Sequence, residues 1–125
     1  MLLRRLADAA VLPSEPVITA VTLAELSVGP LVTDDEGERV ARQAHLQQAE
    51  ADFDPLPFDA SAARAFGGVA ASLRRAGRKA DVRVYDAMIA ATAIANGLPV
   101  YTCSPADFAG IDGLEVVPVC VPGTA

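Results

Sequence analysis

Between Asp86 and Asn96 the chain is apolar except for Thr92. A helix with this pattern is covered on most sides, as a crossover helix packed on a parallel sheet is. Gly97 is suited to a left-handed cap at the end of this helix, and the apolar run Leu98–Thr102 that follows is typical of a buried strand. The segment therefore predicts a buried helix that leads directly into a strand of a sheet.

Other apolar and amphipathic runs predict alternating strands and helices. The expected strands are Val17–Val21, Leu98–Thr102 and Leu114–Val119, the last at an edge because Pro118 cannot donate to a ladder. The expected helices run from Thr22 to Gly29, from Glu36 to Ala51, from Asp59 to Gly77 and from Asp86 to Asn96, and a short one starts at Ser104. Met1–Ala10 reads as the end of an amphipathic helix. This order predicts a three-layer α/β domain in which helices flank a mostly parallel sheet.

Two of these helices carry finer predictions. The side of the second helix that should face the core carries Val40, Ala41, Ala44 and Ala51. His45, the single histidine, has no Ser, Cys or acidic residue one turn away, so it is expected to be a solvated helix residue. Asp59 is expected to cap the third helix.

Length and composition indicate one ordinary globular domain over residues 1–125. With 52% hydrophobic and 21% charged residues, the composition excludes a disordered chain. The N-terminal segment has no apolar run long enough for a signal peptide or a membrane span, so a cytoplasmic protein is expected. Cys103 and Cys120 lack metal-ligand spacing and are expected to be reduced thiols.

The net charge of −6 disfavours nucleic acid as a partner, but the positive charge is clustered. Half of the ten Lys and Arg residues lie in a stretch that ends one helical turn before Asp86; they are Arg74, Arg75, Arg78, Lys79 and Arg83. Such a basic cluster is most often a solvated helix end. Beside acidic residues it is also suited to holding the phosphates of a nucleic acid.

Acidic residues stand at corresponding places in the predicted fold. Glu25 follows the first strand, Asp86 starts the buried helix, and Ser104 and Asp107 follow the strand Leu98–Thr102. All of them are expected near one sheet edge, where ligands of open α/β sheets bind. Carboxylates gathered in a poorly hydrated cleft repel one another unless a cation neutralises them, and oxygen ligands select Mg²⁺ or Mn²⁺. This arrangement favours metal-assisted phosphodiester hydrolysis.

Each acidic residue also has a structural explanation. Glu25 completes a capping-box pattern with Thr22, and Asp107 completes a second one with Ser104. Asp86 stands where an N-cap residue is expected. Spacing alone therefore leaves capping and catalysis open for all three.

Three segments, in this order and spacing, resemble the motifs of PIN-domain ribonucleases, most closely those of VapC-type toxins. They are Val21–Leu26, Asp86–Ala93 and Thr102–Phe108, of which Asp86–Ala93 is the most specific. The resemblance covers most of the chain and implies a PIN-like fold. It also implies a Mg²⁺- or Mn²⁺-dependent endoribonuclease that is neutralised by a cognate antitoxin and usually forms a homodimer.

Carried over by matching positions, the resemblance makes Asp86 and Glu25 active-site acids and Asp107 a further acid near the site. These three are the expected catalytic and metal-binding residues, and the basic cluster is expected to bind the RNA. At the position of Ser104 the family usually has Asn or Asp.

The sequence departs from the family at its N-terminal end. Family members begin with an apolar strand that ends in an aspartate, whereas Met1–Ala10 resembles the end of the following helix. An N-terminally incomplete domain that lacks the usual first strand is therefore expected, with exposed apolar faces that favour oligomers or a partner. The alternative hypothesis is a catalytically inactive PIN-like interaction module that binds an antitoxin or itself.

Overall fold

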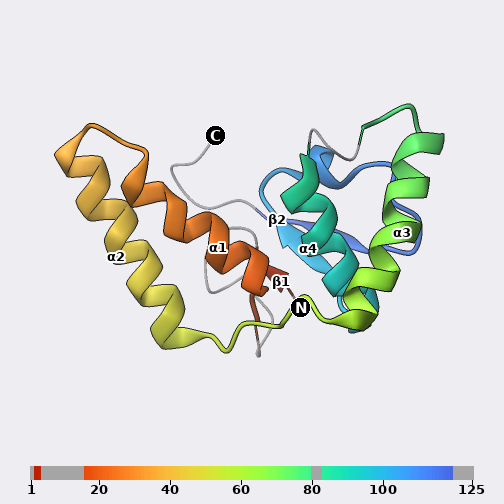
Figure 1. Cartoon of the computed structure of the whole chain (residues 1–125), viewed down its shortest axis with the longest axis horizontal. Coiled ribbons are helices and arrows are strands. Elements are labelled where there is room, and N and C mark those ends of the chain that lie inside the picture. Colours follow the sequence, from red (N-terminus) through yellow and green to blue (C-terminus); the bar gives the residue numbers. More distant parts are fainter. Residues whose placement is uncertain (1, 4–15, 80–82, 120–125) are drawn as a thin grey trace.

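The computed structural model describes residues 2–3, 16–79 and 83–119, and the fold is given for these residues. Its helices are α1 (Ala20–Val28), α2 (Glu36–Asp52), α3 (Ala60–Arg75) and α4 (Val84–Ala95). Its strands are β1 (Leu2–Leu3), β2 (Val100–Thr102) and β3 (Val116–Pro118), and two short 3₁₀ helices, η2 (Gly29–Leu31) and η4 (Pro105–Phe108), follow α1 and β2. Figure 1 shows α1 and α2 as a hairpin that extends to one side, with α3 and α4 on the other.

The sheet of the described residues has the order β1-β2-β3, and both pairs are parallel. Leu2 lies opposite Val100, and Val100 lies opposite Val116. The prediction that the last strand lies at an edge is confirmed. The carboxyl ends of the strands therefore meet at one edge, beyond which η4 begins.

The predicted N-terminal helix is wrong for Leu2 and Leu3, because these residues pair with β2 as β1. The backbone groups along the edge of β2 provide hydrogen-bond partners for an extended segment that a helix end cannot use. β1 thus adds a strand to the sheet where the sequence predicted none, and neither of its residues is acidic. The rest of Met1–Ala10 lies outside the described residues.

Helices cover both faces of the sheet, as predicted for three layers. Successive residues of a strand point to opposite faces. Val100 belongs to the main core, which is formed largely by α3 and α4. Its neighbour Tyr101 packs against a second cluster around Ile18 and Ala49, at the base of the α1–α2 hairpin.

The first helix begins two residues earlier than predicted, and the strand predicted for Val17–Val21 is reduced to isolated bridges. Thr19 is the N-cap, and its hydroxyl oxygen accepts the backbone N–H of Thr22 at 2.9 Å. Thr19 also forms a parallel bridge with Leu56. A threonine hydroxyl caps equally well at either position, and the earlier start lets Val21 enter the core as a helix residue.

The predicted bounds of α2 are close, but its buried side is wrong. Leu46 and Ala49 are buried, whereas Val40 is 61% exposed. The buried side of α2 is set at the base of the hairpin, where Ala49 packs with Ile18 in the second cluster. One buried leucine also removes more apolar area from water than an alanine does.

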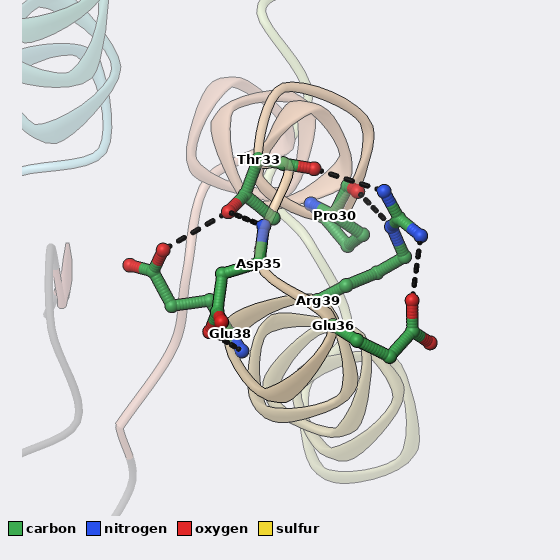
Figure 2. Close-up of polar contacts among 6 residues, drawn as sticks. All are labelled: Pro30, Thr33, Asp35, Glu36, Glu38 and Arg39. Atoms are coloured by element: carbon green, nitrogen blue, oxygen red, sulfur yellow. Dashed lines mark hydrogen bonds and ion pairs between the residues drawn. The ribbon is translucent and has the colours of Figure 1, made fainter.

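Polar contacts among six residues close the corner between η2 and α2 (Figure 2). The Asp35 carboxylate caps α2 by accepting the N–H of Glu38 at 2.8 Å. Thr33 Oγ1 donates to the Glu38 carboxylate at 2.9 Å. The Arg39 guanidinium donates to the carbonyl oxygens of Thr33 and Pro30 and to the Glu36 carboxylate. The corner is thus fixed largely by residues that are near one another in sequence.

Helix α3 agrees with the prediction, and α4 begins two residues before the predicted start at Asp86. Asp59 caps α3 by accepting the N–H of Ala62 at 3.0 Å. Gly77 and Gly97, at the ends of α3 and α4, have φ angles of +77° and +65°, the left-handed conformation that glycine adopts readily. Ala87 and the run from Ile89 to Ala93 on α4 are buried, which confirms the buried central helix.

Candidate active site

The site is built at the carboxyl end of β2. The hydroxyl oxygen of Thr102, the last residue of β2, accepts the N–H of Ser104 at 3.0 Å and turns the chain into η4. Phe108, at the end of η4, is 1% exposed and belongs to the main core. Asp107 is therefore carried on a short helix whose next residue is anchored in the core. Thr102 was expected as the end of a strand and the first residue of the motif Thr102–Phe108, and this contact of its hydroxyl was not predicted.

Asp86 reaches the same place from the first turn of α4. Its side chain is 8% exposed, and the positive end of the helix dipole favours a carboxylate at this position. Because α4 runs into β2 through the turn at Gly97, the start of the helix lies at the edge of the sheet where β2 ends.

Arg83 lies between the two acids. Its Nη1 donates to Asp107 Oδ1 at 2.5 Å and lies 3.7 Å from Asp86 Oδ2. The structure thus brings together two acids that the sequence predicted to converge, around a single guanidinium nitrogen. The Arg83 side chain is 44% exposed, so this position is reachable from solvent.

The structure contradicts the capping roles considered for the acids. The N-cap of α1 is Thr19 rather than Thr22, which places Glu25 in the second turn of the helix and outside a capping box. Asp86 is the third residue of α4, after Arg83 at the N-cap.

The capping box predicted around η4 is also not formed. The Ser104 side chain makes no capping hydrogen bond, and its N–H donates to Thr102 instead of to Asp107. Neither Glu25 nor Asp86 therefore has the capping position that the sequence predicted.

Glu25 is half-buried on α1, which packs against α4. Across the described ranges, no three His, Cys, Asp or Glu side chains form a group that could hold a metal ion. Asp86 and Asp107 are therefore a pair at this site, and Glu25 does not complete a three-residue cluster with them.

The two acids fit a hard divalent cation. Both present a carboxylate oxygen to one position that already holds a positive charge. Carboxylate oxygens are the ligands that Mg²⁺ and Mn²⁺ prefer, and Mg²⁺ is usually bound by one or two carboxylates together with substrate phosphates and water. Two acids are thus a sufficient protein contribution for an ion of this type.

The basic cluster is divided in the structure. Arg75 pairs with Asp112 at 2.9 Å, and Arg78 donates to backbone carbonyl oxygens of the η4 segment. Arg74 and Lys79 are exposed at the end of α3. The five cations therefore do not form one uniform surface.

The sequence also singled out His45 and the two cysteines. His45 is exposed on α2, as expected, and Cys103 is a half-buried free thiol. Cys120 lies outside the described residues. Among the described helices, none is both long and apolar enough to cross a membrane.

A groove of about 590 Å³ lies on the α1–α2 hairpin. Its lining residues are Pro30, Leu31, Glu36, Arg39, Val40, Gln43, Ala44 and Gln47. Leu31 is 84% exposed and Val40 61%, so the hairpin presents apolar side chains to solvent. None of the three predicted acids lines this groove.

Comparison with known proteins decides the family. The PIN domain family model matches residues 2–113. The chain belongs to the PIN domain family. Ribonuclease VapC5 of Mycobacterium tuberculosis is 40% identical over 112 residues, which are 90% of this chain and 80% of the relative. Ribonuclease VapC4 of the same organism is 33% identical over 82% of this chain and 75% of its own length. The predicted resemblance to VapC-type ribonucleases is confirmed.

Solved structures give the same assignment. The structure of VapBC-5, a member of the VapBC family of toxin–antitoxin systems from Mycobacterium tuberculosis, matches with a TM-score of 0.79 and 37% identity. The match covers 92% of this PIN domain and 90% of that chain. DNA-bound VapBC from Salmonella typhimurium matches with a TM-score of 0.72 and 30% identity, over 86% and 77% of the two chains. The predicted PIN-like α/β fold is confirmed.

Proposed function

We propose that this PIN domain is a divalent-metal-dependent endoribonuclease, the toxin of a toxin–antitoxin pair, acting in the cytoplasm. The observation that carries the proposal is the convergence of Asp86 and Asp107 on the Arg83 guanidinium. Homologues named as ribonucleases support the reaction class.

In this proposal Asp86 and Asp107 would hold Mg²⁺ or Mn²⁺, and Glu25, half-buried on α1, is a further acid outside this pair. A bound divalent cation supplies the positive charge that a scissile phosphate requires as negative charge develops on it. The first turn of α4 places Asp86 where the helix dipole favours a carboxylate. Arg83, which lies between the two acids, would be suited to binding a phosphate beside the cut if a cation occupied the acids.

The RNA contacts are assigned according to exposure. Arg74 and Lys79 are exposed at the end of α3 and are suited to binding the phosphate backbone. Arg75, held by Asp112, is assigned a weaker contribution because binding RNA requires it to leave that ion pair. Phosphate contacts of this kind position the strand without reading its sequence.

The decisive experiment is cleavage of a panel of labelled RNAs in Mg²⁺ or Mn²⁺ and in EDTA. Asp86→Asn keeps the size of the side chain and removes its charge, so cleavage should fall about 100-fold or more, the equivalent of nearly 3 kcal/mol of transition-state stabilisation. Asp54→Asn, at an exposed loop position, is the matched control and should cleave normally. Unchanged cleavage by Asp86→Asn, with equal folding, contradicts the proposed role of Asp86.

The proposed partners are RNA, a cognate antitoxin and a second copy of the chain. The antitoxin is inferred because the structural neighbours are VapBC toxin–antitoxin proteins. Exposed Leu31 and Val40 give the hairpin an apolar surface of the kind that protein partners cover. Co-purification with a candidate antitoxin tests the heteromeric pairing, and sedimentation of the chain alone tests the homodimer. A monomer that captures no antitoxin contradicts both.

A further inference from the structure

We infer that Arg78 is a positioning residue for Asp107 and acts through the backbone of η4 rather than by contacting RNA. The inference rests on the proposed function, in which Asp107 is one of the metal-binding acids. It changes the role of one member of the basic cluster from a substrate contact to a support of the site.

The end of α3 fixes the backbone of Arg78. The N–H of Arg78 donates to the carbonyl oxygen of Leu73 at 2.8 Å, and the N–H of Gly77 donates to that of Arg74 at 3.1 Å. Together with the positive φ of Gly77, these two bonds form a Schellman motif. The base of the Arg78 side chain is therefore set by a helix end and not by a loose connection.

The guanidinium then bridges the two sides of the acid-bearing segment. Arg78 Nη1 donates to the carbonyl oxygens of Ala106 at 3.1 Å and Ala109 at 3.2 Å. In sequence these carbonyls flank Asp107 and Phe108. A 3₁₀ helix of this length has few internal hydrogen bonds, so an external donor to its carbonyls contributes much of its rigidity.

A second contact brings the same two segments together. Gly110, directly after the bridged carbonyls, has a φ of +85°, and a Cβ built on it comes within 2.9 Å of Ala76 Cβ. The end of α3 and the exit of η4 are thus in close contact, with Arg78 across the junction. Phe108 anchors η4 in the core from the other side. Asp107, which pairs with Arg83, is consequently carried by a segment that is held on two sides.

This geometry distinguishes Arg78 from the exposed cations of the cluster. A guanidinium that already donates to two carbonyls must break these hydrogen bonds before it can bind a phosphate. Arg74 and Lys79 are exposed, and the contacts described above include no hydrogen bond that either would have to break to bind a phosphate. Partners that orient the first ligands of a metal commonly change metal affinity by about 10- to 100-fold when they are removed.

The test compares Arg78→Ala and Arg78→Lys with Arg64→Ala, an exposed arginine nearer the start of α3. Mn²⁺ affinity is measured without RNA by electron paramagnetic resonance, amide exchange of Ala109 by NMR, and RNA affinity in EDTA. Arg78→Ala should weaken Mn²⁺ binding about 10-fold or more and speed exchange at Ala109, with RNA affinity unchanged. Arg78→Lys should recover part of both, and Arg64→Ala should match wild type in Mn²⁺ binding and exchange.

Arg74→Ala supplies the pattern of a direct RNA contact, with weaker RNA binding in EDTA and unchanged Mn²⁺ affinity. The inference is overturned if Arg78→Ala gives that pattern. If Arg78→Ala does not fold, Arg78→Lys carries the same comparison. If the wild-type chain binds no Mn²⁺, the proposed function fails, while the exchange rate of Ala109 still decides whether Arg78 fixes η4.

Discussion

The 3₁₀ helices η2 and η4 of this PIN domain are held by the same chemistry at different distances along the chain. At η2, Arg42 and Arg39 donate to the carbonyl oxygens of Gly29 and Pro30, which lie 13 and 9 residues away. At η4, Arg78 donates to carbonyls 28 and 31 residues away. We call each set of arginine-to-carbonyl hydrogen bonds a clamp. The η2 clamp forms within the α1–α2 hairpin, whereas the η4 clamp requires α3, α4 and β2 to be in place.

The difference matters because the two 3₁₀ helices present different side chains. η2 carries exposed Leu31 beside the hairpin groove, so its clamp shapes an apolar surface. η4 carries Asp107, so its clamp fixes a charge against Asp86. The η2 clamp, formed by residues close in sequence, holds a surface that needs no exact geometry. The η4 clamp joins distant segments, so the geometry of the acids depends on the completed core.

Glycine substitutions should separate the two clamps most strongly. Gly110→Ala places a methyl group 2.9 Å from Ala76 Cβ at a positive φ, so we expect a loss of about 1–2 kcal/mol from conformation and about 1–3 kcal/mol more from overpacking. Gly113→Ala has a similar φ but open space, so only the first loss applies. Chemical denaturation measures both.

Gly29→Ala is the corresponding test at η2. Its new methyl group meets Arg42 Cδ at 3.3 Å, a flexible side chain, and Gly29 has a helical φ of −48°. Its stability should change by less than about 1 kcal/mol, because the lower entropy of the unfolded chain offsets the contact. If Gly29→Ala costs as much as Gly110→Ala, the hairpin clamp is as rigid as the η4 clamp and the comparison fails.

A smaller effect is expected from the cap inside the hairpin network. Asp35→Ala removes the acceptor for the N–H of Glu38 and should cost about 1 kcal/mol of stability. RNA cleavage should not change, because the hairpin corner is separate from the acids. Asp34→Ala, at the exposed neighbouring position, is the control and should stay within about 0.5 kcal/mol of wild type. A loss of cleavage without unfolding in Asp35→Ala would show that the two regions are coupled.

The sequence was sufficient wherever a pattern is local. The apolar run after Asp86 predicted α4, and single residues predicted the cap at Asp59 and the left-handed turn at Gly97. The motif around Asp86 also indicated the family. In each of these cases the residues that make the contact are within a few positions of one another.

Prediction failed where a distant segment chose between local alternatives. Thr19 and Thr22 are both good caps, and the pairing of Thr19 with Leu56 accompanies the choice of the first. The bridge of Arg83 to Asp107 and the clamp of Arg78 on η4 join residues 24 to 31 positions apart. No spacing rule reports such pairs, so all five basic residues were assigned one role.

The smallest effect is expected from a substitution of Arg83. Arg83→Gln removes the cation that lies between Asp86 and Asp107, and it removes no side-chain cap because Arg83 makes none at the start of α4. A divalent ion then no longer competes with the guanidinium. Since a partly exposed pair contributes at most about 1 kcal/mol, Mn²⁺ affinity should rise about two- to fivefold.

Arg75→Gln, which breaks the pair with Asp112, is the matched control and should leave Mn²⁺ affinity unchanged. Electron paramagnetic resonance of free Mn²⁺, without RNA, measures the Mn²⁺ affinity of the wild type and of both variants. Substitutions of Arg78 and Arg83 should therefore change Mn²⁺ affinity in opposite directions. Loss of Arg78 makes the backbone that carries Asp107 less rigid, whereas loss of Arg83 removes a cation that competes for the acids. An Arg83→Gln protein that binds Mn²⁺ more weakly than wild type would mean that Arg83 holds the acids in position instead of competing for them.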